Sequence, residues 1–275
     1  MSKTRLSRKQ IVEILNSYNL GQLQRYSYFK KGIVHTNILI KTTKGRYVLR
    51  MYEKKYLLKM YGTGRTGKFI DFELALIKRL CHHHFPTPAV IASNQGNEVI
   101  SYKHRPVVIF DYVKGVHVQN PTEKHLIQVG RTLAAMHRIT QGFRPQYSGL
   151  RWNANVKNIK NLAAQLIARG RKKKIRNILL IETLINEEFN RFTFPKSHPQ
   201  GALHADLFKD NVKFHNGKLS GILDFDDSFY GFLLDDVSTA ILGWCFPHNK
   251  FNARLARILL RSYQQVRPLT KEEKA

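Results

Sequence analysis

The sequence has little cysteine, few acidic residues and no long apolar run. Its 275 residues include 2 cysteines, 17 glycines and 9 prolines, which excludes a disulfide scaffold and a collagen repeat. The best apolar candidate, 178–181, ends at Glu182 and is far shorter than the roughly 20 residues of a membrane span. No apolar segment follows the basic first ten residues, so we expect no secretory signal, no membrane partner and a cytoplasmic, reducing location.

Acidic residues are far outnumbered by basic ones. The chain has 19 Asp and Glu against 46 Lys and Arg, a net charge of +27 with histidine neutral, while 43% of its residues are apolar. It is therefore a globular chain that meets phosphates readily. The densest basic run, 169–174, lacks the interleaved aromatic residues of a nucleic-acid site. We interpret this run as a solvated helix face and do not expect a nucleic acid as the partner.

The first half of the chain has the patterns of a β-rich unit. Two β-rich runs, 38–43 and 46–52, flank a short turn that contains Gly45 and predict a hairpin. Apolar residues at 72, 76, 77 and 80 predict a helix that ends before Pro86. The apolar run 106–110 is typical of a buried strand.

The second half is mostly helical in pattern. Asn120 and Pro121 predict a helix start, with Asn120 as the N-cap and Pro121 in the first helical position. A long helical stretch over about 156–192 and a closing helix over about 254–266 follow. We therefore predict an α+β chain with two lobes and a cleft between them. The expected boundaries are 1–113 for the N-terminal lobe and 114–275 for the C-terminal lobe.

One segment of the second half combines the residue types that phosphoryl transfer needs. His204, Asp206 and Asn211 have the spacing His-x-Asp-x-x-x-x-Asn, and Asp224 follows at the end of a short β-rich run. Two short strands around the Asn216-Gly217 turn predict a hairpin that brings Asn211 and Asp224 to the same end. Both are hard oxygen ligands of the kind that Mg²⁺ takes beside nucleotide phosphates. Asp206, on the preceding loop, lies where it would orient a substrate hydroxyl.

The same segment resembles a known family. His204-Ala205-Asp206-Leu207-Phe208 with Asp210-Asn211, and then 221–225, is similar to the aminoglycoside phosphotransferase superfamily, which shares the protein-kinase-like fold. Pieces at 147–150, 233–237 and 240–246 resemble its homoserine kinase branch. The resemblance implies an α+β, two-lobed, protein-kinase-like fold. It also implies a kinase that uses ATP and Mg²⁺ to phosphorylate a small-molecule hydroxyl, with homoserine, giving O-phosphohomoserine in threonine biosynthesis, as the leading acceptor.

The resemblance further implies a role for individual residues. Asp206 would be the catalytic base, and Asn211 and Asp224 would hold Mg²⁺. Arg50 would contact phosphate in the slot where protein kinases have lysine, and Glu73 would pair with it. The remaining nucleotide contacts would come from a phosphate turn and from the linker that meets adenine, through Gly32, Thr36, Asn37, Asp111 and Val113.

Other polar residues of the segment keep more than one interpretation. His204 and Asp236 are candidates for loop support or for substrate contact, and Asp236 is equally a candidate helix cap. Asp226, with Asp227, would add a metal ligand or bind a cationic acceptor, so a choline-type or aminoglycoside acceptor stays open. The alternatives of another class are a non-catalytic kinase-like binder and a basic nucleic-acid-binding protein.

Overall fold

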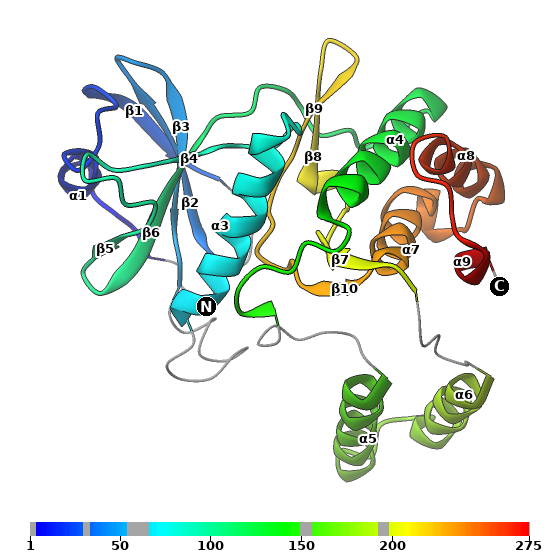
Figure 1. Cartoon of the computed structure of the whole chain (residues 1–275). Coiled ribbons are helices and arrows are strands. Elements are labelled where there is room, and N and C mark those ends of the chain that lie inside the picture. Colours follow the sequence, from blue (N-terminus) through cyan, green and yellow to red (C-terminus); the bar gives the residue numbers. More distant parts are fainter. Residues whose placement is uncertain (1–3, 30–33, 54–65, 149–155, 192–197, 275) are drawn as a thin grey trace.

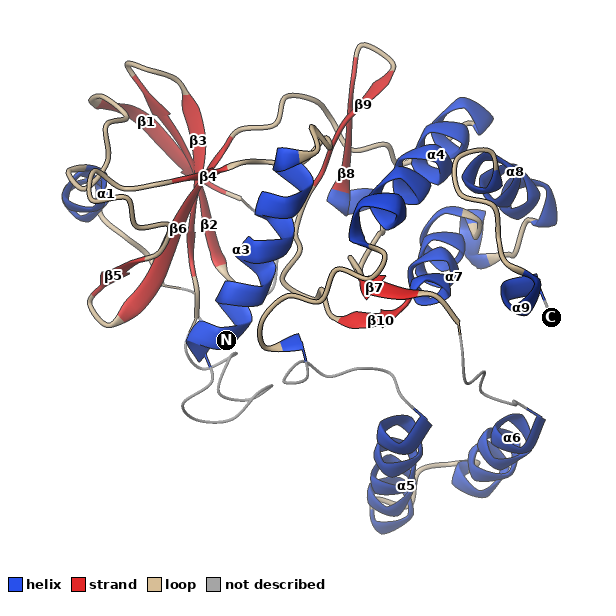
Figure 2. Cartoon of the chain, in the orientation of Figure 1, coloured by secondary structure: helices blue, strands red, loops and turns tan. Residues whose placement is uncertain are grey.

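The computed structural model describes residues 4–29, 34–53, 66–148, 156–191 and 198–274 (Figure 1). Figure 2 shows the division that the sequence patterns predict: a sheet near the N-terminus, and helices with two small strand pairs in the rest of the chain. No helix in the described part combines the length and the apolar character that a bilayer crossing requires.

Within the described residues the larger sheet has six strands, and each pairing is antiparallel. Its path is β1-β2-β3-β6-β4, and β5 pairs with the other end of β6. The strands are β1 (Leu23–Tyr28), β2 (Thr36–Thr42), β3 (Arg46–Met51), β4 (Val90–Ile91), β5 (Ile100–Tyr102) and β6 (Arg105–Asp111). The predicted hairpin is confirmed by β2 and β3, which pair from Thr36 opposite Met51 to Lys41 opposite Arg46.

Both faces of this sheet are covered by helices. Successive side chains of a strand point to opposite faces, so β6 sends Val107 and Ile109 into a core shared with α1 (Arg8–Leu15). It sends Val108 and Phe110 into the second core, which also takes the apolar side of α3 (Thr66–His82). Figure 1 shows the two helices on opposite sides of the sheet. The helix predicted from residues 72 to 80 is therefore confirmed.

Three helices form the body of the C-terminal part. They are α4 (Glu123–Thr140), α7 (Leu233–Trp244) and α8 (Ala253–Gln264), followed by the short α9 (Lys271–Lys274). Helices α4 and α8 cross closely at Gly130, where a Cβ atom would lie 2.5 Å from the Leu259 carbonyl oxygen. The predicted closing helix is confirmed by α8.

Two small strand pairs lie between the sheet and these helices. Strand β7 (Gln200–Ala202) pairs with β10 (Tyr230–Phe232), and β8 (Val212–His215) pairs with β9 (Lys218–Ile222), both antiparallel. A 3₁₀ turn, Lys209–Asn211, leads into β8, and another, Pro247–Asn249, follows α7. A β-bridge between Val116 and Phe214 attaches β8 to the segment that leaves the large sheet.

The start of α4 differs from the prediction. The helix begins at Glu123, and Thr122 rather than Asn120 is its N-cap. The backbone N–H of Thr122 donates to Nδ1 of His125 at 3.0 Å. This contact with the third helical residue satisfies a donor at the helix start, so the helix begins two residues later than the Asn-Pro pair indicates.

The predicted helical stretch over 156–192 is two helices, α5 (Val156–Lys172) and α6 (Ile178–Arg191); residue 192 lies outside the described residues. Lys174 and Asn177 between them have φ angles of 50° and 62°, which no helix residue adopts. The backbone N–H of Ile175 donates to the Gly170 carbonyl at 3.0 Å and closes the turn.

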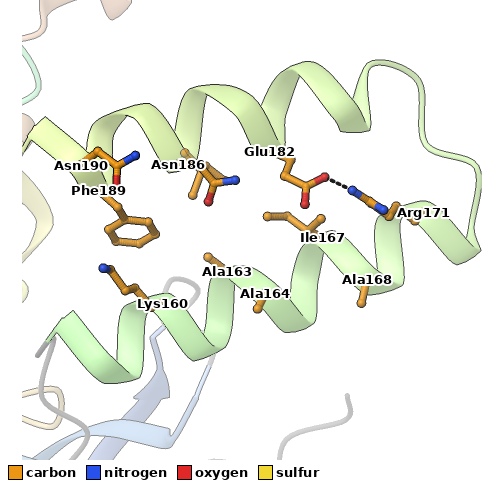
Figure 3. A pocket seen from close by; sticks show the side chains of 11 residues that line it. Lys160, Ala163, Ala164, Ile167, Ala168, Arg171, Glu182, Asn186, Phe189 and Asn190 are labelled. Atoms are coloured by element: carbon orange, nitrogen blue, oxygen red, sulfur yellow. Dashed lines mark hydrogen bonds and ion pairs between the residues drawn. The ribbon is translucent and has the colours of Figure 1, made fainter.

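Figures 1 and 2 show α5 and α6 set apart from α4, α7 and α8. A hollow of about 680 Å³ lies between α5 and α6 (Figure 3). Lys160 and Phe189 project into it at one end, and Arg171 and Glu182 form an ion pair at the other. Several apolar side chains of these helices are exposed, among them Leu162, Leu166, Leu179, Leu180 and Leu184. The predicted site residues all lie on other elements.

Candidate active site

The loop after β7 carries Asp206, and side chains of Asn211 and Trp244 hold it by hydrogen bonds. The Asn211 side-chain amide donates to the Asp206 carbonyl at 2.8 Å and to its Oδ2 at 2.7 Å. The indole Nε1 of Trp244, on α7, donates to the Leu207 carbonyl at 2.9 Å. The Asp206 carboxylate is therefore oriented by Asn211 while it stays half-exposed. Burial and the charge of Asp227 raise the pKa of Asp206.

His204 joins this loop to the segment after β9. Its ring is fully buried; Nδ1 receives the backbone N–H of Asp206 at 3.1 Å, and Nε2 lies 2.9 Å from the Leu223 carbonyl oxygen. Because the first partner is a donor and the second an acceptor, the two contacts assign the neutral Nε2–H tautomer. His204 is thus a support for the loop, and it connects the backbone of Asp206 to that of Leu223, the residue before Asp224.

Asp236, in the first turn of α7, holds the backbone of the same loop by hydrogen bonds. Its side chain is fully buried, and it receives the backbone N–H groups of His204 at 2.8 Å and Ala205 at 2.6 Å. Ala205 has a φ of 68°, a left-handed conformation that costs a non-glycine residue about 1–2 kcal/mol. Asp236 therefore supports a strained loop. It lies inside the helix rather than at its N-cap, which is Phe232.

The β8–β9 hairpin brings Asn211 and Asp224 to one end, as its pattern predicts. Val212 pairs with Ile222, and the backbone N–H of Leu223 donates to the Asn211 carbonyl at 2.8 Å. The side-chain nitrogen Nδ2 of Asn211 donates to Asp206, so the side-chain oxygen Oδ1 of Asn211 faces away from that contact. This oxygen and the Asp224 carboxylate are donors that suit Mg²⁺, which takes few protein ligands and keeps water and phosphate oxygens.

The small number of candidate metal ligands agrees with a second observation. Among the described residues, no group of three or more His, Cys, Asp or Glu side chains gathers to hold a metal ion by itself. A cation at Asn211 and Asp224 would therefore depend on phosphate oxygens for most of its remaining ligands.

Arg50, on β3, is the point where the large sheet meets the hairpin. Its Nη1 donates to Glu73 Oε1 at 3.0 Å, its Nη2 to Asp224 Oδ1 at 2.8 Å and its Nε to Asn37 Oδ1 at 3.0 Å. Tyr52 donates its hydroxyl to the second Glu73 oxygen at 2.8 Å. The predicted Arg50–Glu73 pair is thus present and nearly buried.

The charges in this cluster shift one another. Burial opposes the charge of the Arg50 guanidinium, but Asp224 and Glu73 outweigh it and raise the pKa of Arg50 well above its usual value. Burial would also raise the pKa of Asp224, and Arg50 overcomes it, so that this pKa is lowered. Arg50 therefore favours the ionised form of Asp224, the form that could act as a cation ligand.

Asp226 differs from its neighbour Asp224. Burial and the charge of Asp224 raise its pKa well above the usual value. Its Oδ2 lies 3.4 Å from Nε2 of His35, and its side chain is mostly buried. Asp226 shares a hydrogen bond with Asp224, so it lies beside the candidate cation ligands.

The segment predicted as a phosphate turn is only partly visible, because Gly32 lies outside the described residues. Thr36 and Asn37, on β2, point to opposite faces of the sheet. The Thr36 hydroxyl is buried and contacts Glu53 at 2.7 Å, away from Arg50. Asn37 receives Arg50 Nε. The Asn37 side chain therefore orients Arg50, and any phosphate contact of Thr36 would have to come from its backbone.

The linker predicted to meet adenine is held by the elements beside it. Asp111 receives the backbone N–H of Ala89 on its carboxylate at 2.6 Å. The Val113 carbonyl receives the Lys213 ammonium at 3.0 Å, and this ammonium also lies 4.5 Å from the ring centre of Tyr112. Burial lowers the pKa of Lys213.

Sequence reasoning missed Lys213, Tyr52 and His137. Lys213 interrupts the apolar run Val212-Lys213-Phe214, and a charged residue inside a buried hairpin was the available signal. His137, fully buried on α4, contacts Asp236 at 3.1 Å; it follows the apolar stripe of that helix, where one histidine gives no signal of its own. Tyr52 follows β3 directly, and its link to Glu73 depends on how α3 packs.

Comparisons with known proteins agree with this geometry. The family model APH, described as the phosphotransferase enzyme family, matches residues 25–269. The chain is similar to the homoserine kinase of Rhizobium meliloti, with 31% identity over 98% of this chain and 79% of that protein.

Two solved structures share the fold. An aminoglycoside phosphotransferase from Alicyclobacillus acidocaldarius has a TM-score of 0.72 and 13% identity over 99% of this chain and 81% of that chain. An amicoumacin kinase in complex with AMP-PNP and Ca²⁺ has a TM-score of 0.68 and 16% identity over 96% of this chain and 79% of that chain. The expected α+β, protein-kinase-like fold is thereby confirmed.

Proposed function

The chain belongs to the APH phosphotransferase enzyme family, and we propose that it transfers the γ-phosphate of ATP to the side-chain hydroxyl of homoserine. As a member of this family it is an ATP-dependent kinase of small-molecule hydroxyls. The observation that supports homoserine is the identity of about a third with a homoserine kinase, which extends over nearly the whole of this chain. The product would be O-phosphohomoserine, an intermediate of threonine biosynthesis.

Asp206 is the residue that we propose as the catalytic base. Its carboxylate is oriented by the Asn211 amide at 2.7 Å and remains half-exposed. In this role it would accept a hydrogen bond from the homoserine hydroxyl and align its oxygen with the γ-phosphate. It would accept the hydroxyl proton as the new P–O bond forms and as the bond between the γ-phosphorus and the β–γ bridging oxygen breaks, which leaves ADP. The raised pKa of Asp206 favours the acceptance of that proton.

Arg50 is the residue that we propose for the phosphates. A guanidinium has five N–H groups, and among the described residues three of them donate to Glu73, Asp224 and Asn37. The other two would donate to phosphate oxygens, with the Glu73 contact fixing their direction. Asn211 and Asp224 would hold Mg²⁺, which supplies neutralisation of the phosphate charge when bound.

This assignment uses two lobes, with a proposed boundary between residues 113 and 114. The N-terminal lobe would bind the nucleotide through the sheet, Arg50 and the linker backbone at Asp111 and Val113. The C-terminal lobe would supply Asp206, Asn211 and Asp224 together with the acceptor site. The Arg50–Asp224 contact of 2.8 Å supports a reaction centre where the two meet.

A cationic acceptor is the second candidate, and one observation favours it. Asp226 and Asp227 follow Asp224 directly, and Asp226 lies against the same cluster. Acidic side chains of this kind would suit the ammonium groups of choline-type or aminoglycoside acceptors. Homoserine also has an ammonium group, so these residues fit the first proposal as well.

A coupled assay of ADP release over a panel of acceptors tests the proposal. The panel contains homoserine, choline, ethanolamine and an aminoglycoside, each with ATP and Mg²⁺, and ³¹P NMR identifies the product. We expect the highest kcat/KM with homoserine, and Asp206→Ala to lower it by about 10²–10⁴-fold. Asp210→Ala is the matched control, because Asp210 is an exposed carboxylate in the same loop and should change the rate little.

Each outcome of the panel has a clear meaning. Phosphorylation of choline or of the aminoglycoside without phosphorylation of homoserine would replace the proposed acceptor. Full activity of Asp206→Ala would remove Asp206 from the reaction. Nucleotide binding without turnover on any acceptor would contradict homoserine as the substrate and favour a binding role.

We propose the cytoplasm as the place where the enzyme works. Cys81 and Cys245 are free thiols in the structure, as is usual in a reducing compartment, and ATP is supplied there. Fractionation of cells with an antibody to the chain tests this, and recovery with the membrane or the exported fraction would contradict it.

A further inference from the structure

A buried chain of hydrogen bonds leads away from the catalytic loop into the helical core. Asp236, which holds the loop at His204 and Ala205, lies 3.1 Å from Nε2 of His137 on α4. Nδ1 of His137 lies 2.7 Å from the hydroxyl of Tyr263 on α8. The side chains of Asp236, His137 and Tyr263 are all fully buried, so each polar atom depends on its protein partner.

The series of hydrogen bonds continues to α9, the C-terminal helix. Nη1 of Arg267 donates to the Tyr263 hydroxyl at 3.0 Å, and the guanidinium makes two hydrogen bonds with Glu273, of 3.2 and 3.0 Å. Glu273, on α9, is itself fixed by Thr270, whose backbone N–H donates to the carboxylate at 2.9 Å. Arg267 and Glu273 are both buried, which makes this a charge pair with little access to water.

The donors and acceptors in this series of hydrogen bonds can be assigned in only one direction. Asp236 is an acceptor, since its two carboxylate oxygens receive the backbone N–H groups of His204 and Ala205. Nε2 of His137 must then donate to it. If His137 is neutral, Nδ1 accepts, the Tyr263 hydroxyl donates to it, and the Tyr263 oxygen accepts from Arg267. If His137 were charged, the hydroxyl proton of Tyr263 would lose this acceptor.

We propose that His137 and Tyr263 are positioning residues of the phosphoryl-transfer site, and that Arg267 and Glu273 carry this support to α9. Tyr263 fixes the tautomer of His137, and His137 then holds Asp236 under the loop that carries Asp206. The strained φ of Ala205 makes the loop depend on this support, because strain persists only where the surroundings enforce it. The inference rests on the proposed role of Asp206 and not on the identity of the acceptor.

The first test compares two substitutions of buried tyrosines, Tyr263→Phe and Tyr18→Phe. Tyr18 is 5% exposed, and its hydroxyl has no hydrogen-bond partner in the described part of the chain. We expect Tyr263→Phe to lower kcat about tenfold with KM for ATP and acceptor changed less than about twofold, because a misplaced catalytic group loses rate without losing ground-state contacts. Tyr18→Phe should leave kcat and KM unchanged.

Glu273→Gln is the second variant, because it keeps the shape of α9 while it weakens the pair with Arg267. It should lower kcat in the same direction as Tyr263→Phe, by less. The proposal is overturned if both variants, folded by circular dichroism, keep the kcat of the Tyr18→Phe control. It is also overturned if the loss appears in KM alone.

A measurement on the unaltered enzyme needs no turnover. In a ¹H–¹⁵N NMR spectrum of histidine side chains, with His137→Gln used to assign the signal, His137 should be the neutral Nε2–H tautomer. An Nδ1–H tautomer or a charged ring at neutral pH overturns the proposed direction of the chain. If the acceptor panel fails for homoserine, this readout is unaffected, and the kinetic comparison uses the acceptor that the panel identifies.

Discussion

Asp235 and Asp236 are adjacent at the start of α7, yet their pKa values shift in opposite directions. Burial and the neighbouring charge of Asp236 raise the pKa of Asp235 to about 6. Asp236 is more buried, but hydrogen bonds with His137 and the catalytic loop lower its pKa. The ionised form of Asp235 therefore opposes folding, whereas the ionised form of Asp236 is built into it.

Replacing Asp235 should make the stability less sensitive to pH. Between pH 3.8, the usual value, and about pH 6 the unfolded chain releases this proton first, so the free energy of unfolding falls as pH rises; above about 6 the whole cost applies. Asp235→Asn should raise the free energy of unfolding at pH 7.5 by on the order of 2 kcal/mol, and by little near pH 4. Thermal unfolding at several pH values measures this difference.

The control for this prediction is Glu187→Gln, which removes one negative charge from an exposed position of α6. Its effect on Tm should be small and should vary little with pH. A destabilising effect of Asp235→Asn at pH 7.5 would mean that the carboxylate makes a contact that outweighs its burial.

Residues whose role follows from spacing could be predicted, and those whose role depends on packing could not. The positions of Asp206 on the loop after β7, and of Asn211 and Asp224 at one end of the β8–β9 hairpin, follow from one short segment. The register of β8 with β9 brings the last two together. The hydroxyl of Thr36 instead meets Glu53, and the Lys213 ammonium meets the Val113 carbonyl. The charge of Lys213 stands out in an apolar run, but the partner could not be predicted for either residue, because both partners come from distant segments.

At the scale of elements, the site depends on a close crossing of α4 and α8. These helices carry His137 and Tyr263, and they touch at Gly130, where a Cβ would lie 2.5 Å from the Leu259 carbonyl oxygen. Backbone at that distance cannot be moved aside as a side chain can. The absence of a side chain at Gly130 therefore sets the separation of the two helices.

Gly130→Ala should separate these helices and destabilise the enzyme by about 1–3 kcal/mol, as overpacking of a core does. Gly67→Ala is the matched control: Gly67 lies in α3, with no atom within 4 Å of an added Cβ, so alanine should be neutral or add up to about 1 kcal/mol. Chemical denaturation of the two variants and of the unaltered chain gives these differences. Equal stability of Gly130→Ala and the unaltered chain would show that the helices move apart without cost.

The elements themselves differ in how well their sequence predicts them. The β2–β3 hairpin and α3 have strong periodic patterns and short connections, so local reasoning finds both. The division between α5 and α6 has no proline, and its left-handed residues, Lys174 and Asn177, are ones that also fit a helix. The break therefore becomes visible only from the backbone.

At the scale of the whole molecule, acidic side chains are scarce, yet several of them gather at the proposed reaction centre. The chain carries +27 overall, but the carboxylates of Glu73 and Asp224 both lie against one guanidinium, that of Arg50. A nucleotide approaching this cluster meets carboxylates that repel its phosphates. Binding should then depend on a divalent cation that both carboxylate and phosphate oxygens can share.

Addition of Mg²⁺ with a non-hydrolysable ATP analogue should therefore raise Tm, whereas the analogue with EDTA should raise it little. At about 100 times Kd, binding adds about 2.7 kcal/mol, which corresponds to about 5 °C or more for a chain of this size. Asp224→Asn should lose most of the Mg²⁺-dependent shift, and Asp210→Asn should keep it. A full shift in EDTA would contradict the proposed metal ligands.

The left-handed backbone at Ala205 implies a trade between stability and activity. Glycine adopts such a φ without steric cost, so Ala205→Gly should leave Tm unchanged or raise it slightly. The same change frees the loop that presents Asp206 and should lower kcat several-fold. A lowered Tm with full activity would contradict this expectation. A stabilised but slower enzyme would show that this chain gives up some of its stability to hold one carboxylate in place.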